Sequence, residues 1–446
     1  MTPLSDAGVA RSGVASMELG ERDTRRSHRR LGPGLGWRRL GPGLITGAAD
    51  DDPSGIATYS QAGAQFGLSM LWTVVFTLPL MVAIQMVSAR IGYVTGRGLA
   101  ANIKASFPRW VLYAVVGMLV VANVLNVAAD IAAMGGALQL LVRGSARLYA
   151  VAFGLSCLLL QVFLPYKSYV KWLKWLTLTL LAYAGVAFTL HIDWHQVLSE
   201  VAMPRLPAGS SVHDVVLMVV AVFGTTISPY LFFWQAAQEI EDDSHGALHT
   251  AKAVRRHLGR IKIDTLLGMT FSNLIAFFII LSTAATLHAA GITDIQTSAQ
   301  AAEALRPLAG EFTFLLFSLG IIGTGMLAVP VLVGSAAYAI AEAAGWQGSL
   351  GLRLDRNEGR GFYGVIAAAT LGGVLLCFTP TDPVRELFWA AVINGVIAVP
   401  IMAVMMLLAS RARTMGAHVI GVRLRWLGWI ATAAMAGTVA AMVGTL

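Results

Sequence analysis

The sequence predicts an all-α membrane protein built from two inverted repeats of five transmembrane helices, followed by one extra helix. Hydrophobic residues make up 56% of the chain and charged residues 13%, whereas about 25% of the residues in soluble proteins are charged. Eleven apolar runs come near the length of about 20 residues that crosses a bilayer. The first and the sixth runs are each interrupted by an X-Pro pair. Five runs per half is an odd number, so the second half enters the membrane inverted.

The apolar runs give the bounds of the expected helices and domains. They cover residues 40–60, 69–90, 110–141, 147–165, 172–191, 213–237, 264–287, 312–341, 361–378, 386–409 and 425–445. No loop between them is large enough to fold separately, so we expect residues 39–446 to form a single transmembrane domain. Residues 1–38 are polar and rich in arginine and lack the apolar region of a secretory signal. We expect them to form a disordered cytosolic tail.

Basic residues are distributed unevenly between the two ends of the expected helices. If the N-terminus lies in the cytosol, 27 of the 32 Lys and Arg residues fall on cytosolic segments. Positive residues favour the cytosolic side, so we expect a cell membrane protein, of the bacterial inner-membrane type, with an external C-terminus. This interleaving accounts for the net charge of +8 without a nucleic-acid-binding surface. Cys157 and Cys377 lie in apolar runs and predict neither a disulfide framework nor a cysteine-rich metal site.

Both interruptions carry groups that can bind a cation. The first is Ala-Asp-Asp-Asp-Pro-Ser-Gly over residues 49–55, and the second is Gly-Thr-Thr-Ile-Ser-Pro-Tyr over residues 224–230. Proline disfavours helix at the residue before it, and the freed carbonyl groups must find partners or line a wet cavity. Paired broken helices mark the binding site of many secondary transporters. The carboxylate of Asp52 at the first break predicts that the ligand is a cation.

Asp52 is the strongest candidate ligand, because a charge at bilayer depth costs at least about 2.5–3.5 kcal/mol and is usually functional. A helix cap or a surface loop is the alternative, but apolar sequence continues on both sides of the break. Asp50 and Asp51 point elsewhere on a helix, so we expect them to support the site or to line its vestibule. The carbonyl oxygens of Ala49 and Thr225 are further candidate ligands, because hard cations prefer oxygen.

Other polar residues of the apolar runs have alternative interpretations. Ser228 precedes its proline as Asp52 does, and its hydroxyl either binds the ion or a water, or satisfies carbonyls of its own helix. Asp130 either relays protons or pairs with a polar neighbour. We expect the asparagines of the apolar runs to form hydrogen bonds between helices, namely Asn123, Asn126, Asn273 and Asn394. The polar residues after the second break are candidates to line the path to the cytosol, namely Gln235, Gln238 and Glu239.

Residues 41–67 resemble the first helix of the NRAMP family of divalent metal transporters. They contain Asp-Pro, Ile-Ala-Thr and Gln-Ala-Gly-Ala, and the family signature is Asp-Pro-Gly-Asn followed by the same two motifs. Residues 88–100 resemble the end of the family's second helix, and a looser resemblance covers the rest of the transmembrane region. It implies a LeuT-type fold of ten core helices plus one. It also implies that a metal ion is the transported substrate and that no cofactor is needed.

The chain departs from the family pattern at several ligand positions. The family's aspartate falls on Asp52, but its asparagine three residues later is Gly55. The Met-Pro-His of the family's sixth helix is replaced by Ser228, a proline and Tyr230. The resemblance therefore gives Gly55 and Tyr230 as further candidate positions of a metal site. It transfers the main ligand, whereas the sulfur ligand of the family is lost.

These departures predict the ion and its coupling. A thioether favours softer transition metals, whereas oxygen ligands suit Mg, Ca and Mn, and Mg²⁺ is often bound through retained waters. The third helix keeps Asp130 but has Ala133 where the family has glutamate, and the ninth helix lacks the family's arginine. We therefore expect passive or weakly proton-coupled uptake of a divalent cation, with Mn²⁺ or Mg²⁺ ahead of Fe²⁺.

Three other functions are compatible with parts of this pattern. A sodium-coupled symporter of an organic amine would neutralise the amine with Asp52 and use Ser228 in an ion site. A membrane enzyme would need a nucleophile–base set or a metal cluster at depth, and no histidine lies deep in an apolar run. A receptor that does not transport would leave the paired breaks without a purpose. We expect a divalent cation and the lipid bilayer as partners, no nucleic acid, and a monomer.

Overall fold

The computed structural model of the chain describes residues 42–164, 178–203, 205, 207, 209–243, 251–351, 359–379 and 382–445. Helices account for most of these residues, and no strand occurs within them. The predicted tail over residues 1–38 lies outside the described part of the chain.

The first predicted run is a helix broken in two. α2 (Pro42–Asp50) ends where α3 (Pro53–Phe66) has not yet begun, and the two residues between them are not helical. Asp52 is the N-cap of α3, with an extended backbone, and Pro53 occupies the first helical position. Proline is tolerated there because the amide of that position has no partner within the helix. The Asp-Pro pair therefore starts a new helix inside the apolar run.

The sixth predicted run is broken in the same way. α11 (Val212–Thr226) and α12 (Pro229–Asp243) are separated by Ile227 and Ser228. α12 again begins at a proline. The two interruptions predicted from the X-Pro pairs are therefore confirmed.

The other predicted runs also contain helices. The 3₁₀ turn η2 (Gly67–Met70) joins α3 to α4 (Leu71–Thr95) without a gap. The remaining long helices are α6 (Arg109–Leu141), α7 (Ala146–Phe163), α13 (Ala251–Thr283), α16 (Thr313–Ala344), α17 (Arg360–Leu376), α18 (Pro383–Ala409) and α20 (Val422–Gly444). The shorter elements are α5 (Leu99–Ser106), η3 (Leu178–Leu180), α9 (Leu181–Thr189), α10 (Trp194–Ala202), the π-helical turn η4 (Ala284–His288), α14 (Ser298–Ala302), η5 (Glu303–Leu305), α15 (Arg306–Ala309), η6 (Gly310–Phe312), α19 (Ala412–Met415) and η8 (Gly416–His418).

The number of membrane crossings stays a prediction. Among the described residues, eight helices are long and apolar enough to cross a membrane, and two shorter apolar helices cover Leu178–Thr189 and Arg360–Leu376. One of the eight, Pro53–Thr95, contains parts of two predicted runs because η2 makes α3 and α4 continuous. Part of the fifth run, residues 172–177, lies outside the described residues.

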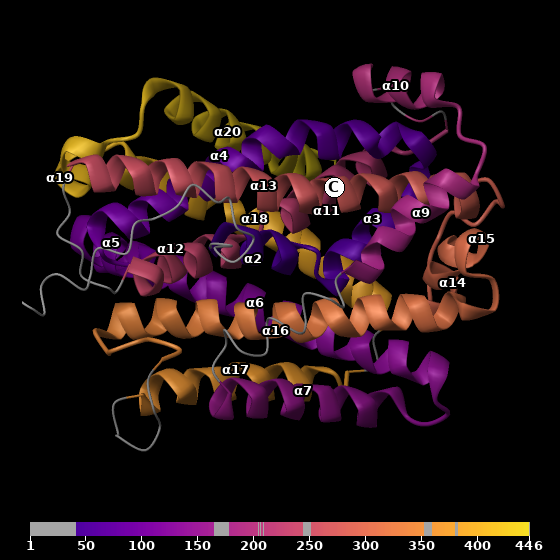
Figure 1. Ribbon diagram of the computed structural model, residues 1–446, viewed down its shortest axis with the longest axis horizontal. Coiled ribbons are helices and arrows are strands. Elements are labelled where there is room, and N and C mark those ends of the chain that lie inside the picture. Colours follow the sequence, from indigo (N-terminus) through magenta and orange to yellow (C-terminus); the bar gives the residue numbers. More distant parts are fainter. Residues whose placement is uncertain are drawn as a thin grey trace, which may run out of the picture. The chain divides into compact units, whose positions relative to one another are not determined.

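The helices pack in two groups around the broken segments (Figure 1). α6 packs against α7, α16, α17 and α18, whereas α13 packs against α2, α3 and α4. Small residues allow the closest contacts, as is usual between membrane helices. A Cβ atom added at Gly47 of α2 would lie 2.3 Å from the carbonyl oxygen of Gly268 of α13. A Cβ atom at Gly224 of α11 would lie 2.5 Å from the amide of Gly395 of α18.

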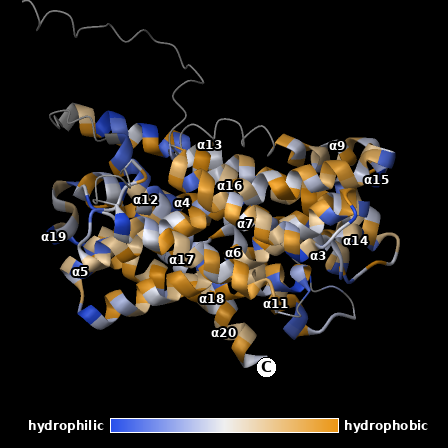
Figure 2. Cartoon of the chain, turned by 90° about the horizontal axis from the view of Figure 1, so that it is seen from below, coloured by the Kyte–Doolittle hydropathy of each residue, from blue (hydrophilic) through white to orange (hydrophobic). Residues whose placement is uncertain are grey.

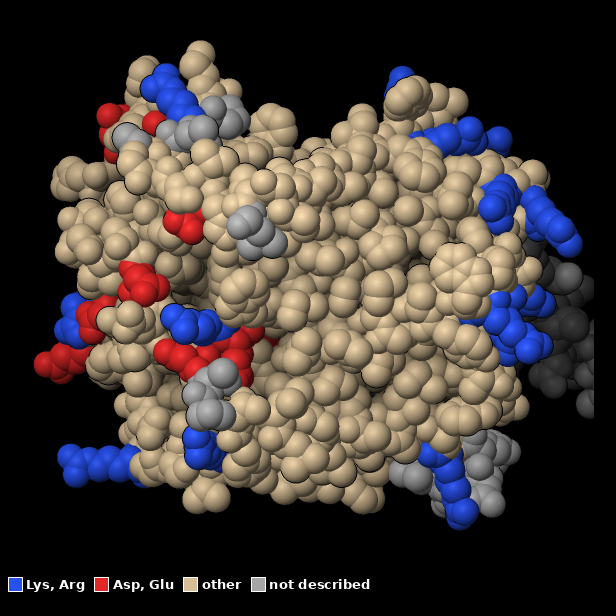
Figure 3. Space-filling model, turned by 180° about the vertical axis from the view of Figure 1, so that it is seen from behind, with Lys and Arg blue, Asp and Glu red and all other residues tan. Residues whose placement is uncertain are grey.

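The surface has the polarity of a membrane protein. Hydrophobic residues run along the helices, and hydrophilic residues gather toward the helix ends (Figure 2). The most exposed large apolar side chains, each at least 70% exposed, are Trp110, Leu148, Phe163, Phe188 and Leu375. On the face shown in Figure 3, all visible Asp and Glu side chains lie toward one end of the helices, and the opposite end shows only Lys and Arg. That basic end is the one where α5 and α19 lie in Figure 1.

Candidate functional site

The carboxyl group of Asp52 lies between the two broken helices. Its Oδ1 atom accepts a hydrogen bond from the amide of Gly55 at 2.7 Å, which caps α3. Its Oδ2 atom accepts one from the hydroxyl of Tyr230, in the first turn of α12, at 3.3 Å. Asp52 is only 2% exposed. One oxygen therefore holds the helix start in place, and the other faces the second break.

Tyr230 also reaches the end of α2. Its hydroxyl lies 3.0 Å from the carbonyl oxygen of Ala49, near the C-terminus of that helix. A single hydroxyl proton serves both bonds, so the two acceptors share one donor. Three oxygen atoms of candidate ligands thus converge at this point: Oδ2 of Asp52, the carbonyl of Ala49 and the hydroxyl of Tyr230.

Gly55 lies where α3 approaches α11. A Cβ atom at this position would lie 3.3 Å from Oγ1 of Thr225 and 3.3 Å from the ring of Tyr59. The absence of a side chain therefore lets the two helices come close beside Asp52. The amide of Gly55 donates its hydrogen bond to Asp52, so this glycine contributes only backbone atoms to the site.

The side chain of Ser228 bonds back to the end of α11. The Ser228 hydroxyl donates to the carbonyl oxygens of Gly224 at 3.0 Å and Thr225 at 2.8 Å. This is the second interpretation given above, in which the serine satisfies carbonyls of its own helix. Thr225 lies inside α11, because the amide of Ile227 still bonds to the carbonyl of Phe223 at 2.8 Å. The break therefore falls at residues 227–228, within the predicted stretch 224–230, and the metal-binding role of both residues stays a prediction.

Asp50 and Asp51 face α13 instead of the second break. Both are buried, at 1% and 2% exposed. The hydroxyl of Ser272 lies 2.6 Å from Oδ2 of Asp50 and 3.0 Å from Oδ1 of Asp51. The expectation that these two residues point away from Asp52 agrees with this geometry.

Asp130, on α6, is fully buried, and neither of its carboxyl oxygens has a hydrogen-bond partner within the described residues. Asp130 lies close enough to Asp52 for the charges of the two carboxyl groups to affect each other. The backbone amide of Ser54, at the start of α3, lies near this carboxyl group, and the role of Asp130 stays a prediction. Gln235 is part of α12. Its side chain points to α13, where it donates a hydrogen bond of 3.1 Å to the hydroxyl of Thr265.

The asparagines of the apolar runs bond mostly between helices, as predicted. Asn126 and Asn394 exchange hydrogen bonds of 3.0 and 3.3 Å between α6 and α18. Asn123 donates to the hydroxyl of Ser335 on α16 at 2.7 Å. These bonds join α6 to α16 and α18.

Sequence analysis missed three residues around the breaks. The hydroxyl of Ser272 faces two carboxyl groups as a donor, those of Asp50 and Asp51. The hydroxyls of Tyr59 and Thr226 lie 3.0 Å apart and tie α3 to α11. None of the three stands beside a proline or an acid in the sequence, and hydroxyl residues are common in membrane helices, so no local signal marked them.

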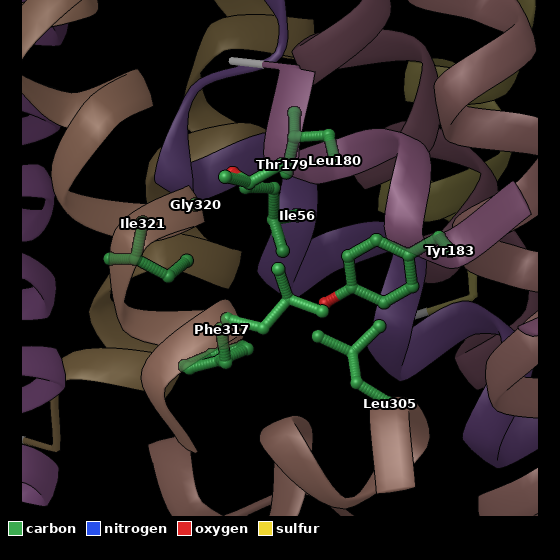
Figure 4. Close-up of a pocket in the computed structure, with 9 residues that line it drawn as sticks. Ile56, Thr179, Leu180, Tyr183, Leu305, Phe317, Gly320 and Ile321 are labelled. Carbon is green, nitrogen blue, oxygen red and sulfur yellow. The ribbon is translucent and has the colours of Figure 1, made fainter. Parts of the chain in front are cut away.

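A small apolar pocket begins one helical turn beyond Asp52. Ile56 of α3 lines it together with residues of η3, α9, η5 and α16, and these side chains leave no room for a water molecule. Figure 4 shows Tyr183 directing its hydroxyl into the pocket, between Leu305 and Phe317. No group of three or more His, Cys, Asp or Glu residues that could hold a metal occurs in the described ranges. A metal at Asp52 would therefore rely on carbonyl, hydroxyl and water oxygens.

Comparisons with known proteins place this geometry in a family. Residues 43–445 match the family model of natural resistance-associated macrophage protein-like (Nramp) proteins. The divalent metal cation transporter MntH of Pectobacterium carotovorum is 28% identical over 295 residues, which cover 64% of this chain and 68% of the relative. The MntH protein of Erwinia tasmaniensis is 28% identical over 304 residues, with the same coverage.

Solved structures show the same fold. The Eremococcus coleocola manganese transporter matches with a TM-score of 0.70 at 16% identity, over 93% of this chain and 95% of its own. Mhp1, a nucleobase-cation-symport-1 transporter, matches with a TM-score of 0.58 at 12% identity, over 91% and 92%. The predicted all-helical LeuT-type fold is therefore confirmed. Nramp proteins are transporters and not enzymes, and need no cofactor. The match over nearly all of the transmembrane region shows that this chain belongs to the Nramp family.

Proposed function

We propose that this chain imports a divalent metal ion across the cell membrane by alternating access. The observation that carries the proposal is the convergence of three oxygens, from Asp52, Ala49 and Tyr230, where the two broken helices meet. One negative charge and two neutral oxygens suit a hard cation. Relatives that carry the names divalent metal cation transporter and manganese transporter support the same class of substrate.

Mn²⁺ and Mg²⁺ are the favoured ions, with Fe²⁺ behind them. The positions where the family resemblance expects sulfur and imidazole hold Ser228 and Tyr230. Oxygen ligands favour Mg and Mn, whereas sulfur favours softer metals. With few protein ligands at the site, the ion keeps part of its water shell, which suits Mg²⁺ because it dehydrates reluctantly.

Coupling to protons is expected to be weak or absent. Asp130 is the remaining acid of the relay that the family resemblance implies, and Ala133 stands where the second acid would be. Asp130 lies near Asp52 and the backbone amide of Ser54, but no side chain of the described residues forms a hydrogen bond with its carboxyl group. A relay needs a next acceptor within hydrogen-bond reach. The geometry thus supports passive transport, with at most a minor contribution of Asp130 to proton movement.

The proposed orientation has the N-terminus in the cytosol and the C-terminus outside. The distribution of Lys and Arg in the sequence supports it, because 27 of 32 then lie on the cytosolic side. The basic end of the helices in Figure 3 would be the cytosolic end. The amine symporter considered as an alternative is not favoured, because the family and its named relatives carry metal cations.

Ion flux into proteoliposomes tests the proposal. Purified chain is reconstituted, and uptake of Mn²⁺ and of Mg²⁺ is followed with and without a pH gradient. We expect uptake of at least one of these ions, little changed by the gradient, and its loss in Asp52→Ala. Asp382→Ala is the matched control, because Asp382 also caps a helix that begins with proline, α18, but is exposed. The proposal fails if neither ion enters, or if Asp52→Ala transports as well as the control.

A further inference from the structure

Three consecutive buried carboxyl groups lie at the first break without a basic partner. Asp50, Asp51 and Asp52 are each at most 2% exposed. The ion pairs of the described residues involve Glu239, Asp242 and Glu303, and none involves these three aspartates. Asp50 also ends α2, where the helix dipole adds partial negative charge. Buried carboxyl groups are paired, coordinate a metal or are neutralised by a proton.

Asp52 is accounted for by the proposed transport site, but Asp50 and Asp51 are not. Their carboxyl groups converge on one hydroxyl, that of Ser272, at 2.6 and 3.0 Å. A hydroxyl has a single proton to donate, so it satisfies one of the two carboxylates fully. Oδ1 of Asp50 has no hydrogen-bond partner within the described residues. An acceptor oxygen that is buried and unpartnered therefore stands beside two other oxygens that converge on the same point.

We propose that Asp50, Asp51 and Ser272 form a second site for a hard divalent cation, beside the transport site at Asp52. Two carboxylates balance the charge of one such ion, as the buried geometry requires. The ligand set contains oxygen only, which suits Mg²⁺ and Mn²⁺, with waters completing the coordination shell. This inference rests on the proposed function, since it assigns the second ion to the same class of substrate.

The surroundings of this second site supply a path for the ion. Ser272 is preceded along α13, at intervals of about two turns, by Thr265 and then His257. Gln235 donates to Thr265 at 3.1 Å, and His257 contacts Glu239 at 3.2 Å. Gln235 and Glu239 are the α12 members of these pairs. The Oε1 atom of each is buried and has no hydrogen-bond partner in the described residues. A line of free acceptor oxygens thus leads from the second site toward the N-terminal end of α13.

Counting bound Mn²⁺ tests the second site. The full chain in detergent is titrated with Mn²⁺, and the free ion is measured by its six-line electron paramagnetic resonance signal. We expect two bound ions per wild-type chain and one in Asp52→Asn. We also expect one in the double variant Asp50→Asn, Asp51→Asn. Two nearby Mn²⁺ ions broaden each other's spectrum, so the bound signal of the wild type should be broader than that of either variant.

Ser272→Ala and Ser282→Ala separate the site from a general effect on α13. Both serines are buried in α13, but the Ser282 hydroxyl donates to the carbonyl of Ile279 in its own helix. Ser272→Ala should weaken the second ion alone, and Ser282→Ala should keep both. Size-exclusion profiles report whether each variant is folded. One bound ion in the wild type, unchanged in the double variant, overturns this inference and leaves the transport site intact. No bound ion and no flux overturn the proposed function itself.

Discussion

The hydroxyl of Tyr230 on α12 lies 3.3 Å from Oδ2 of Asp52, at the start of α3. The same hydroxyl bonds to the last turn of α2 through Ala49. One side chain thus connects three of the four half-helices at the breaks. In the proposed alternating access the broken helices move relative to each other around a fixed site, so this hydroxyl contact should break or move with the helices.

Tyr230→Phe removes this connection without changing the size of the ring. A hydrogen bond to a charged group contributes about 1.5–3 kcal/mol, so we expect a lower melting temperature and reduced Mn²⁺ flux. Thermal denaturation in detergent and uptake by proteoliposomes measure the two effects. Tyr149→Phe is the control, because the Tyr149 hydroxyl bonds to the carbonyl of Arg143 in the exposed segment after α6. Equal stability and flux in both variants would show that the connection has no role.

Asp130→Asn replaces a buried acid by a neutral residue of the same shape. Since neither carboxyl oxygen has a partner within the described residues, loss of the charge should raise the melting temperature. Any stimulation of uptake by an inward proton gradient should disappear, because the variant cannot carry a proton. If the stimulation is the same in variant and wild type, Asp130 does not relay protons.

Gly47→Ala tests the close contact between α2 and α13. The new methyl group would lie 2.3 Å from a backbone carbonyl oxygen of Gly268, which cannot rotate away as a side chain can. Overpacking costs about 1–3 kcal/mol, so the melting temperature should fall. Gly117→Ala in α6 should leave it unchanged or slightly higher, because no atom lies within 4 Å of the added methyl group. A similar melting temperature for both variants would refute the close contact.

Asn126 and Asn394 should be energetically coupled. Their amides exchange two hydrogen bonds between α6 and α18, and such bonds in membrane proteins contribute about 0.6 kcal/mol on average, with a maximum near 1.7 kcal/mol. A double-mutant cycle with alanine at each position should give a coupling energy in this range. Additive effects of the two substitutions would contradict the bonding.

The breaks could be predicted because proline acts locally. Asp52 lies beside the second break as the Asp-Pro pair indicated, and Asn126 bonds to a neighbouring helix as a buried amide must. The exact end of α11 could not be predicted, since proline constrains only the residue before it. Ile227 therefore still bonds to Phe223, and Thr225 stays helical.

Partners from distant helices were beyond the reach of the sequence. Asp50 and Asp51 were expected to point away from Asp52, but their shared contact with Ser272 depends on how α2 packs against α13. That packing is set by the close approach at Gly47, which no local pattern encodes. Similarly, the bond between Tyr59 and Thr226 joins residues 167 positions apart.

Anomalous diffraction from crystals soaked in Mn²⁺ tests the central claim most directly. The account predicts a peak within bonding distance of Oδ2 of Asp52 and the carbonyl oxygen of Ala49, close to the hydroxyl of Tyr230. A well-diffracting crystal whose strongest peak lies away from both breaks would contradict it.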